Sequence, residues 1–154
     1  MNPRLIHGNS TVNYLHWLDY DLSPQVGAAR FSSGTPNVPG ILSIGASLSL
    51  LQELGPADID AYTQQLAAYT IGALTDEGYE VITPRGAHGP ITTFCSPYDS
   101  DTTDRLVQFL ADRQVVVCKH LDAAKNSYLR VSLHCYNTTA DINRLLDEMR
   151  KFVS

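Results

Sequence analysis

The sequence predicts an α/β chain of the two-layer α+β kind. Apolar residues follow helical spacing from residue 39 to residue 76, the spacing changes to two residues after Gly78, and helical spacing returns between residues 137 and 152. Long helices followed by mixed strands and helices are typical of a sheet packed against a helical layer. At 154 residues the chain is long enough to bury a core of its own.

The first half of the chain is expected to hold an arm and two helices. Residues 1–38 carry scattered aromatic residues without a period, which indicates an arm that lies against other protein surface. Residues 39–54 form the first predicted helix, which Gly55 and Pro56 end, and residues 57–76 form the second, with Gly78 as its C-terminal cap. The apolar face predicted for the second helix consists of Ile59, Tyr62, Leu66, Tyr69 and Ala73.

The second half is expected to hold the sheet. Alternation predicts a strand pair from residues 79–83 and 90–96, and Asp101 to Asp104 has the form of a helix N-terminus. Further strands are predicted at 115–118 and 128–136. Asn137 and Thr138 open a final helix, whose stripe toward the sheet is Ile142, Leu145, Leu146, Met149 and Phe152.

Composition excludes some classes of partner. The formal charge is −5 and no basic run opposes it, so neither nucleic acid nor an anionic membrane is an expected partner. The longest apolar stretch, residues 38–51, is interrupted and falls short of the roughly 20 residues of a membrane span. Three cysteines without paired spacing (Cys95, Cys118, Cys135) are expected to be buried free thiols in a reducing compartment, which predicts a cytoplasmic protein.

Two segments are candidates for ligand contacts. The turn at residues 31–37 precedes a helix, so Thr35 and free backbone N–H groups could hold a phosphate, although such residues commonly cap the helix instead. Arg130 lies among apolar residues in a predicted strand, where a guanidinium suits capture of a carboxylate; the alternative is an edge arginine that points to solvent. By period two, His134 and Tyr136 share its face, with structural roles. The remaining histidines are dispersed and predict no metal site.

Two segments in series carry a resemblance to a known family. They are RFSSGTPNVPGI at residues 30–41 and YLRVSLHCYNTTADI at residues 128–142, separated by the helices. Together they resemble the class V aminotransferases, the fold-type I pyridoxal-phosphate (PLP) enzymes that include cysteine desulfurases, selenocysteine lyases and isopenicillin-N-epimerase-like proteins. The resemblance extends from about Leu5 to Val153.

The resemblance implies an architecture and site residues. Residues 39–154 would be the C-terminal small domain with its linking helix and a mostly antiparallel sheet, and residues 1–38 a remnant of the large domain. Gly34 and Thr35 match the Gly-Thr that reaches the cofactor phosphate of the other subunit of a dimer. Arg130 matches the arginine that grips the α-carboxylate of an amino-acid substrate. The implied cofactor is PLP, and the implied partners are a second copy or a companion large domain.

Two departures from the family shape the functional hypothesis. The Schiff-base lysine is missing, because none of Lys119, Lys125 and Lys151 fits it and the family lysine comes upstream of this sequence. Cys118 lacks the motif that flanks the nucleophile of desulfurases, which favours a transaminase-like or epimerase-like parent. The leading hypothesis is the C-terminal segment of such an enzyme, inactive alone. The alternatives are a non-catalytic carboxylate-binding or interaction module, and a PLP-independent enzyme built on His and Asp residues of the arm.

Overall fold

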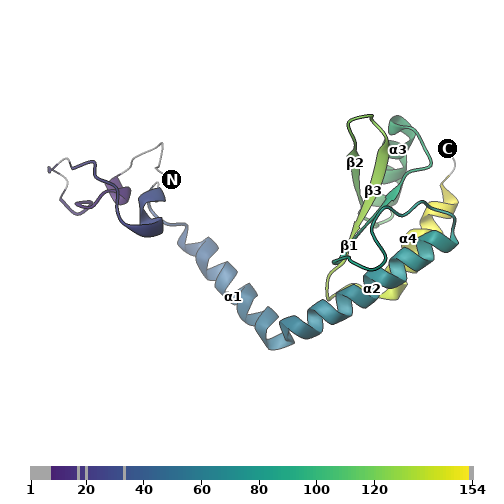
Figure 1. The fold of residues 1–154 in the computed structure, drawn as a ribbon, viewed down its shortest axis with the longest axis horizontal. Helices are drawn as coiled ribbons and strands as arrows, with labels where there is room; N and C mark the ends of the chain where they lie inside the picture. Colours follow the sequence, from purple (N-terminus) through teal and green to yellow (C-terminus); the bar gives the residue numbers. More distant parts are fainter. Residues whose placement is uncertain (1–7, 17, 20, 33, 153–154) are drawn as a thin grey trace. The chain divides into compact units, whose positions relative to one another are not determined.

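A computed structural model describes residues 8–16, 18–19, 21–32 and 34–152. The chain divides into two compact units, residues 1–51 and residues 52–154 (Figure 1). The first holds two short 3-10 helices and most of helix α1, and the second holds helix α2, the sheet and the remaining helices. The division between the two units falls within helix α1, near its C-terminal end.

The N-terminal unit begins with a closed loop. Its 3-10 helices are η1 (Gly8–Ser10) and η2 (Gly27–Phe31), and an isolated bridge joins Thr11 to Pro24. Val12 donates its N–H to the Ser23 carbonyl at 3.0 Å, which closes the loop further. The large apolar side chains of this loop nevertheless stay exposed: Leu18 is 92% and Val26 90% accessible. Backbone hydrogen bonds therefore hold this segment, and Ser10 and Thr11 are its buried residues within the described part.

Both predicted long helices are confirmed. Helix α1 spans Val38–Leu54 and α2 spans Pro56–Asp76. The break between them is Gly55, whose φ of 82° is left-handed, and Gly78 ends the second helix with a φ of 87°. The face predicted for α2 is wrong by about one position, because Tyr62 and Tyr69 are exposed. The side chains that α2 does bury are Thr63, Leu66, Ala67, Thr70, Ile71 and Leu74.

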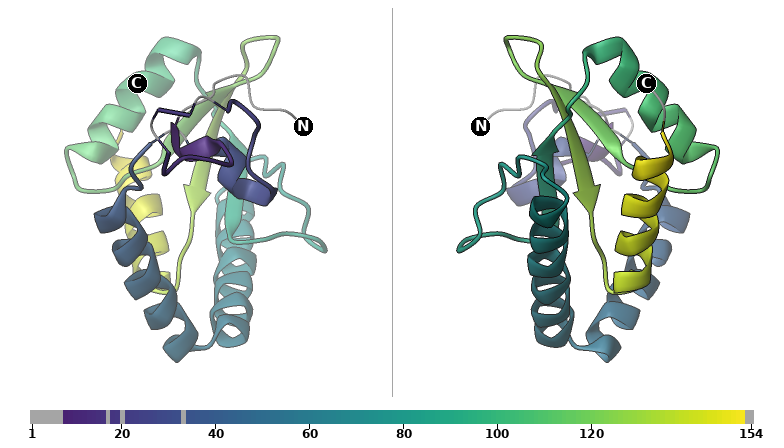
Figure 2. Two further views of the ribbon diagram at one scale, coloured as in Figure 1. Left: turned by 90° about the vertical axis from the view of Figure 1, so that its left-hand side faces the viewer. Right: turned by 90° about the vertical axis from the view of Figure 1, so that its right-hand side faces the viewer.

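The C-terminal unit has the predicted two-layer α+β architecture. Its antiparallel sheet has the order β1-β3-β2, with β1 at Ile91–Cys95, β2 at Cys118–Leu121 and β3 at Ser127–Ser132. The helical layer consists of α2, α3 (Ser100–Ala111) and α4 (Thr139–Lys151). Helix α2 packs on β1 and α4, and α3 packs on β2 and α4 (Figure 2).

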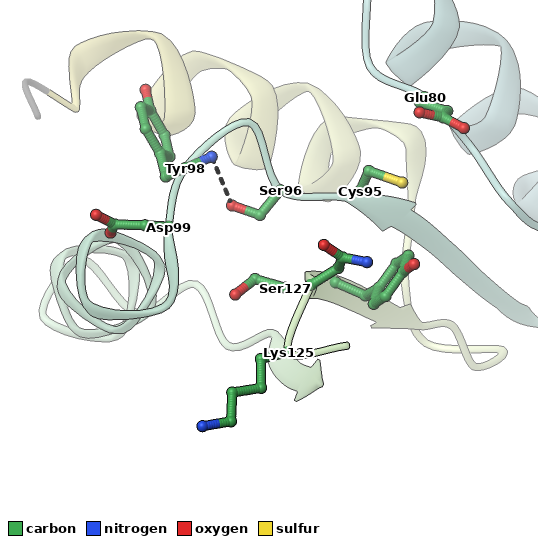
Figure 3. A pocket seen from close by; sticks show the side chains of 9 residues that line it. Glu80, Cys95, Ser96, Tyr98, Asp99, Lys125 and Ser127 are labelled. Atoms are coloured by element: carbon green, nitrogen blue, oxygen red, sulfur yellow. Dashed lines mark hydrogen bonds between the residues drawn. The ribbon is translucent and has the colours of Figure 1, made fainter. Parts of the chain in front are cut away.

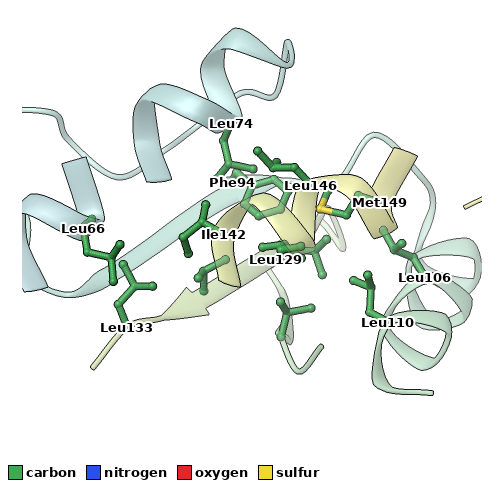
Figure 4. Packing of buried hydrophobic residues seen from close by; sticks show 14 residues of the cluster. Leu66, Leu74, Phe94, Leu106, Leu110, Leu129, Leu133, Ile142, Leu146 and Met149 are labelled. Atoms are coloured by element: carbon green, nitrogen blue, oxygen red, sulfur yellow. The ribbon is translucent and has the colours of Figure 1, made fainter. Parts of the chain in front are cut away.

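The core lies between the sheet and this helical layer. Along β3 the side chains alternate, with Ser127, Leu129 and Val131 buried and the residues between them partly exposed. The predicted stripe of α4 meets these residues (Figure 4), and Phe152 packs at its edge. The buried cluster comprises Leu66, Ala67, Leu74, Phe94, Leu106, Leu110, Val117, Leu129, Val131, Leu133, Ile142, Leu145, Leu146 and Met149.

The predicted strands need three corrections. Residues 79–83 pair antiparallel with β1 as predicted, but only through the bridge of Val81 to Phe94, and β3 pairs with the other edge of β1. The strand predicted at 115–118 begins only at Cys118, because the chain bends as it leaves α3 through Gln114, whose φ is 62°. The long strand predicted to reach residue 136 ends at Ser132, since a turn closed by Asn137 follows it.

Caps explain where the last two helices begin. The N-cap of α3 is Asp99, whose Oδ1 accepts the Thr102 N–H at 2.8 Å, so the prediction of Asp101 is wrong by two residues. Helix α4 begins after Thr138 as predicted, and the Asp141 carboxylate accepts the Thr138 N–H at 2.8 Å in a capping box.

Within the described residues no single helix is long and apolar enough to cross a membrane, and only α1 and α2 taken together as a broken pair reach that length and hydropathy.

Candidate functional site

Arg130 lies at the centre of the sheet, on the face turned away from the helical layer. In the register of the sheet it pairs with Thr93 of β1 on one side and with Cys118 of β2 on the other. Paired residues of antiparallel strands project to the same face, so these three side chains are neighbours. The Arg130 Nε is buried, and no hydrogen-bond partner for it exists within the described part of the chain. A buried guanidinium N–H without an acceptor is a vacant donor for an anion.

The cysteines differ from their prediction as buried thiols. All three are free, but Cys118 is exposed and Cys95 and Cys135 are partly exposed. Cys118 lies on a strand at the edge of the sheet, beside Arg130, rather than in a hydrophobic interior. Partial burial raises the pKa of the Cys95 thiol, and the neighbouring Glu80 carboxylate adds to the effect.

His134 and Tyr136 do not continue the strand face of Arg130, because β3 has already ended. Their rings stack on one another with centroids 4.9 Å apart, and Tyr136 is largely exposed. The His134 Nδ1 lies 3.1 Å from the Cys135 Sγ. Asn137 closes this turn by accepting the His134 N–H with its side chain at 2.9 Å, while its carbonyl accepts the Tyr62 hydroxyl at 2.7 Å. These residues therefore fix the turn that leads into α4.

Gly34 and Thr35 belong to the N-terminal unit, so they and Arg130 lie in different compact units. Asn37, and not Thr35, caps α1, because its Oδ1 accepts the Gly40 N–H at 3.1 Å. Val38 donates its own N–H to the Pro36 carbonyl at 2.8 Å. The exposed Thr35 hydroxyl has no hydrogen bond to any residue that the structure describes. The capping alternative for Thr35 is therefore not what the structure shows.

The three lysines have defined surroundings. The Lys119 ammonium donates to the Ser100 hydroxyl and carbonyl, each at 2.7 Å, and pairs with Asp104. Lys151 pairs with Glu148 on the last turn of α4. Lys125 lies in the turn before β3 with a left-handed φ of 66°. Two of the three ammonium groups are therefore already paired with carboxylates.

A polar pocket that the sequence analysis did not identify lies at the end of β1 and β3. It has a volume of about 380 Å³, and its walls include Ser96, Asp99, Lys125 and Ser127 (Figure 3). The signal in the sequence was the polar turn at 122–127, which by itself indicates only a hairpin connection. No group of three or more His, Cys, Asp or Glu side chains suited to a metal ion occurs within the described residues.

The chain is similar in sequence to proteins of a known family. A family model described as "Aminotransferase class-V" matches residues 8–145. A probable cysteine desulfurase from Halalkalibacterium halodurans is 28% identical over 132 residues, which are 79% of this chain and 32% of that protein. Isopenicillin N epimerase from Amycolatopsis lactamdurans is 31% identical over 121 residues, which are 77% of this chain and 30% of that protein.

Solved structures share the fold. The apo cysteine desulfurase from Thermococcus onnurineus NA1 superposes with a TM-score of 0.79 at 22% identity, over 97% of this chain and 38% of that one. The chain thus spans about a third of the length of the relatives that it matches. The family model covers most of the sequence, and the chain belongs to the class V aminotransferase family.

Proposed function

We propose that this chain is the C-terminal part of a PLP-dependent class V enzyme that acts on an amino-acid substrate, and that it is inactive without further protein. The observation that carries the proposal is the Arg130 guanidinium, whose Nε–H is buried without an acceptor and whose side chain projects from the sheet face turned away from the helices. Its neighbours Thr93 and Cys118 carry no charge that would compete for it. An α-carboxylate is the ligand that a planar guanidinium in such a place accepts best.

The cofactor of the family fits one segment of the chain. PLP supplies an electron sink for chemistry at the α-carbon of an amino acid. The Thr35 hydroxyl is exposed, takes no part in capping α1 and adjoins Gly34, so it is available to donate to a phosphate group. The first turn of α1 has fewer N–H groups to donate to a phosphate. The Val38 and Gly40 N–H groups already have acceptors, and Pro39 has no N–H group. We assign the phosphate contact to Thr35.

The surroundings of the lysines support inactivity of the chain alone. Lys119 and Lys151 are held in ion pairs, and Lys125 lies in a turn outside the sheet face that carries Arg130. None offers the amine on which the chemistry of this cofactor depends. Adding PLP, reducing with borohydride and mapping the product by mass spectrometry should therefore give no lysine that reacts faster in the folded chain than in urea. Turnover of an amino acid by the purified chain with PLP would overturn the proposal.

The role of Arg130 can be tested independently of turnover. Titration of the labelled chain with an amino acid should shift the amide resonances of Thr93, Cys118 and Arg130. Arg130→Gln should weaken this binding by roughly tenfold to a hundredfold, which corresponds to the ~1.5–3 kcal/mol of a charge-assisted hydrogen bond. Arg105→Gln is the matched control, since Arg105 is an exposed arginine of α3. Equal effects of the two substitutions would refute a carboxylate site at Arg130.

A second candidate is a non-catalytic carboxylate-binding or interaction module derived from the same fold. It is favoured by the location of the whole Arg130 surface within residues 52–154, which form one compact unit. Both candidates predict carboxylate binding at Arg130. They differ when a companion large domain of the family is added with PLP, because only the enzyme fragment should then gain turnover that depends on Arg130.

A further inference from the structure

The polar pocket at the ends of β1 and β3 contains a buried hydroxyl without a partner. Ser127 is only 6% exposed, and its Oγ is buried with no hydrogen-bond partner among the described residues. The backbone of Ser127 is occupied, because its carbonyl accepts the Ser96 N–H at 2.9 Å. Figure 3 shows the Ser127 hydroxyl directed to the same side as the Lys125 side chain. Burying an unsatisfied hydroxyl costs free energy, which a bound polar ligand would recover.

Hydrogen bonds to Asp122 fix the conformation of the turn that carries Lys125. Lys125 has a left-handed φ of 66° and donates its N–H to the Asp122 carbonyl at 3.0 Å. The two carboxylate oxygens of Asp122 accept the Asn126 backbone and side-chain N–H groups, each at 2.8 Å. These bonds lower the pKa of Asp122, because they favour its charged form. The ammonium group of Lys125 has no ion-pair partner within the described chain.

The charges of the walls select among ligands. The walls carry one cation, Lys125, and two carboxylates, Glu80 and Asp99. A phosphate dianion would meet two like charges, and a simple amine would leave Lys125 unpaired. A molecule with both a carboxylate and an ammonium group matches the pocket. The volume of about 380 Å³ accommodates a small amino acid.

We propose that this pocket is a second ligand site, separate from Arg130, for a small zwitterionic amino acid. Lys125 and Ser127 would bind its carboxylate, and Glu80 or Asp99 its ammonium group. Arg130 lies further along β3 and does not line the pocket. The inference does not rest on the proposed function, because it depends only on the residues of this pocket.

The test is an NMR titration of the ¹⁵N-labelled full chain with L-alanine, N-acetyl-L-alanine and L-alaninamide. L-Alanine should shift the amides of Ser96, Tyr98 and Ser127 saturably. Both analogues lack one of the two charges and should bind at least about tenfold more weakly at these amides. Shifts from N-acetyl-L-alanine as strong as those from L-alanine, or no shift from any probe, would overturn the proposal.

Variants separate this pocket from Arg130 and from folding. Ser127→Ala and Lys125→Gln should each weaken the pocket response by about fivefold or more. Ser127→Ala should leave the melting temperature unchanged or raised, since it removes an unsatisfied hydroxyl, whereas a structural serine would lower it. Ser132→Ala and Lys151→Gln are the matched controls. Arg130→Gln should abolish shifts at Thr93 while leaving those at Ser127; loss of both together would show one site and refute a second.

Discussion

Helices α1 and α4 both carry several large apolar residues, but only α4 packs them into a core. Helix α4 buries four apolar side chains on a single stripe, with charged residues on its other sides. Helix α1 buries none of its residues, and Ile41, Leu42, Ile44, Leu48 and Leu50 are all more than half exposed. A helix that is apolar all round is typical of a helix enclosed by protein on every side. The comparison teaches that α4 belongs to a core within the C-terminal unit, whereas the apolar side chains of α1 contribute to no core among the described residues.

The small residues of α1 support this conclusion. Gly45 has nothing within 4 Å of the position where a Cβ would stand. Three serines satisfy their hydroxyls within the helix, each donating to the carbonyl four residues earlier at distances from 2.8 to 3.1 Å. These serines therefore need no polar partner outside the helix, and the small residues of α1 allow another element to approach closely. Both properties suit a packed interface more than a surface in water.

The largest expected difference between the two helices is in core energetics. Leu146→Ala in α4 should lower the free energy of unfolding by about 2–5 kcal/mol, because Leu146 is 5% exposed and a cavity would remain in the core. Leu48→Ala in α1 should change it by less than about 0.5 kcal/mol, because Leu48 is 54% exposed. Urea denaturation followed by circular dichroism measures both. A similar loss in the two variants would mean that α1 is packed in the isolated chain.

Self-association gives a second test of the difference between the exposed helix α1 and the packed helix α4. We expect the chain to associate through α1, so Leu42→Glu with Leu48→Glu should raise the dissociation constant by about tenfold or more in sedimentation experiments. Val116→Glu is the control, because Val116 is 82% exposed but isolated in the C-terminal unit. A wild-type chain that sediments as a monomer at high concentration would contradict the expectation.

The elements that the sequence predicted well are those governed by local rules. Both long helices, the Gly55 break, the Gly78 cap and the Thr138 start of α4 follow from glycine, proline and capping chemistry that neighbouring residues determine. The apolar stripe of α4 also followed, because its period is strong and its charged residues leave one possible buried side. Helix α2 is apolar on more of its circumference, so the sequence alone did not decide which side the sheet would cover.

Pairing between distant segments could not be predicted in the same way. Residues 79–83 do bridge to β1 through Val81 and Phe94, but the pairing of β1 with β3, which carries Leu129 and Val131 into the core, was not predicted. The position of Arg130 on a strand was predictable, but its neighbours Thr93 and Cys118 depend on that register. The polar pocket at the ends of β1 and β3 forms where three separate segments meet, so no local sequence motif predicts it. For the same reason the exposure of Cys118 was not predicted.

Helix caps give a smaller test of the two regions. Asp141→Ala removes the carboxylate that accepts the Thr138 N–H, and it should cost about 1 kcal/mol in the unfolding of the C-terminal unit. Asn37→Ala removes the corresponding acceptor for Gly40 in α1, and it should reduce helical circular dichroism without moving that transition. Amide resonances of core residues such as Leu129 and Leu146 report the C-terminal unit separately. A shift of that transition by Asn37→Ala would show that the two units unfold together.

The smallest expected effect is a pH dependence that resides in the C-terminal unit. The guanidinium of Arg150 holds the pKa of Glu77 below its usual value through a hydrogen bond from Nε at 3.1 Å. Because the pKa is lower in the folded chain, the unfolded chain binds the proton first, and stability falls as the pH drops below about 4.3. Glu77→Gln should flatten that part of the stability profile, while Glu53→Gln on the exposed surface of α1 should leave it unchanged. An unaltered profile in Glu77→Gln would mean that the ion pair is fully screened by solvent.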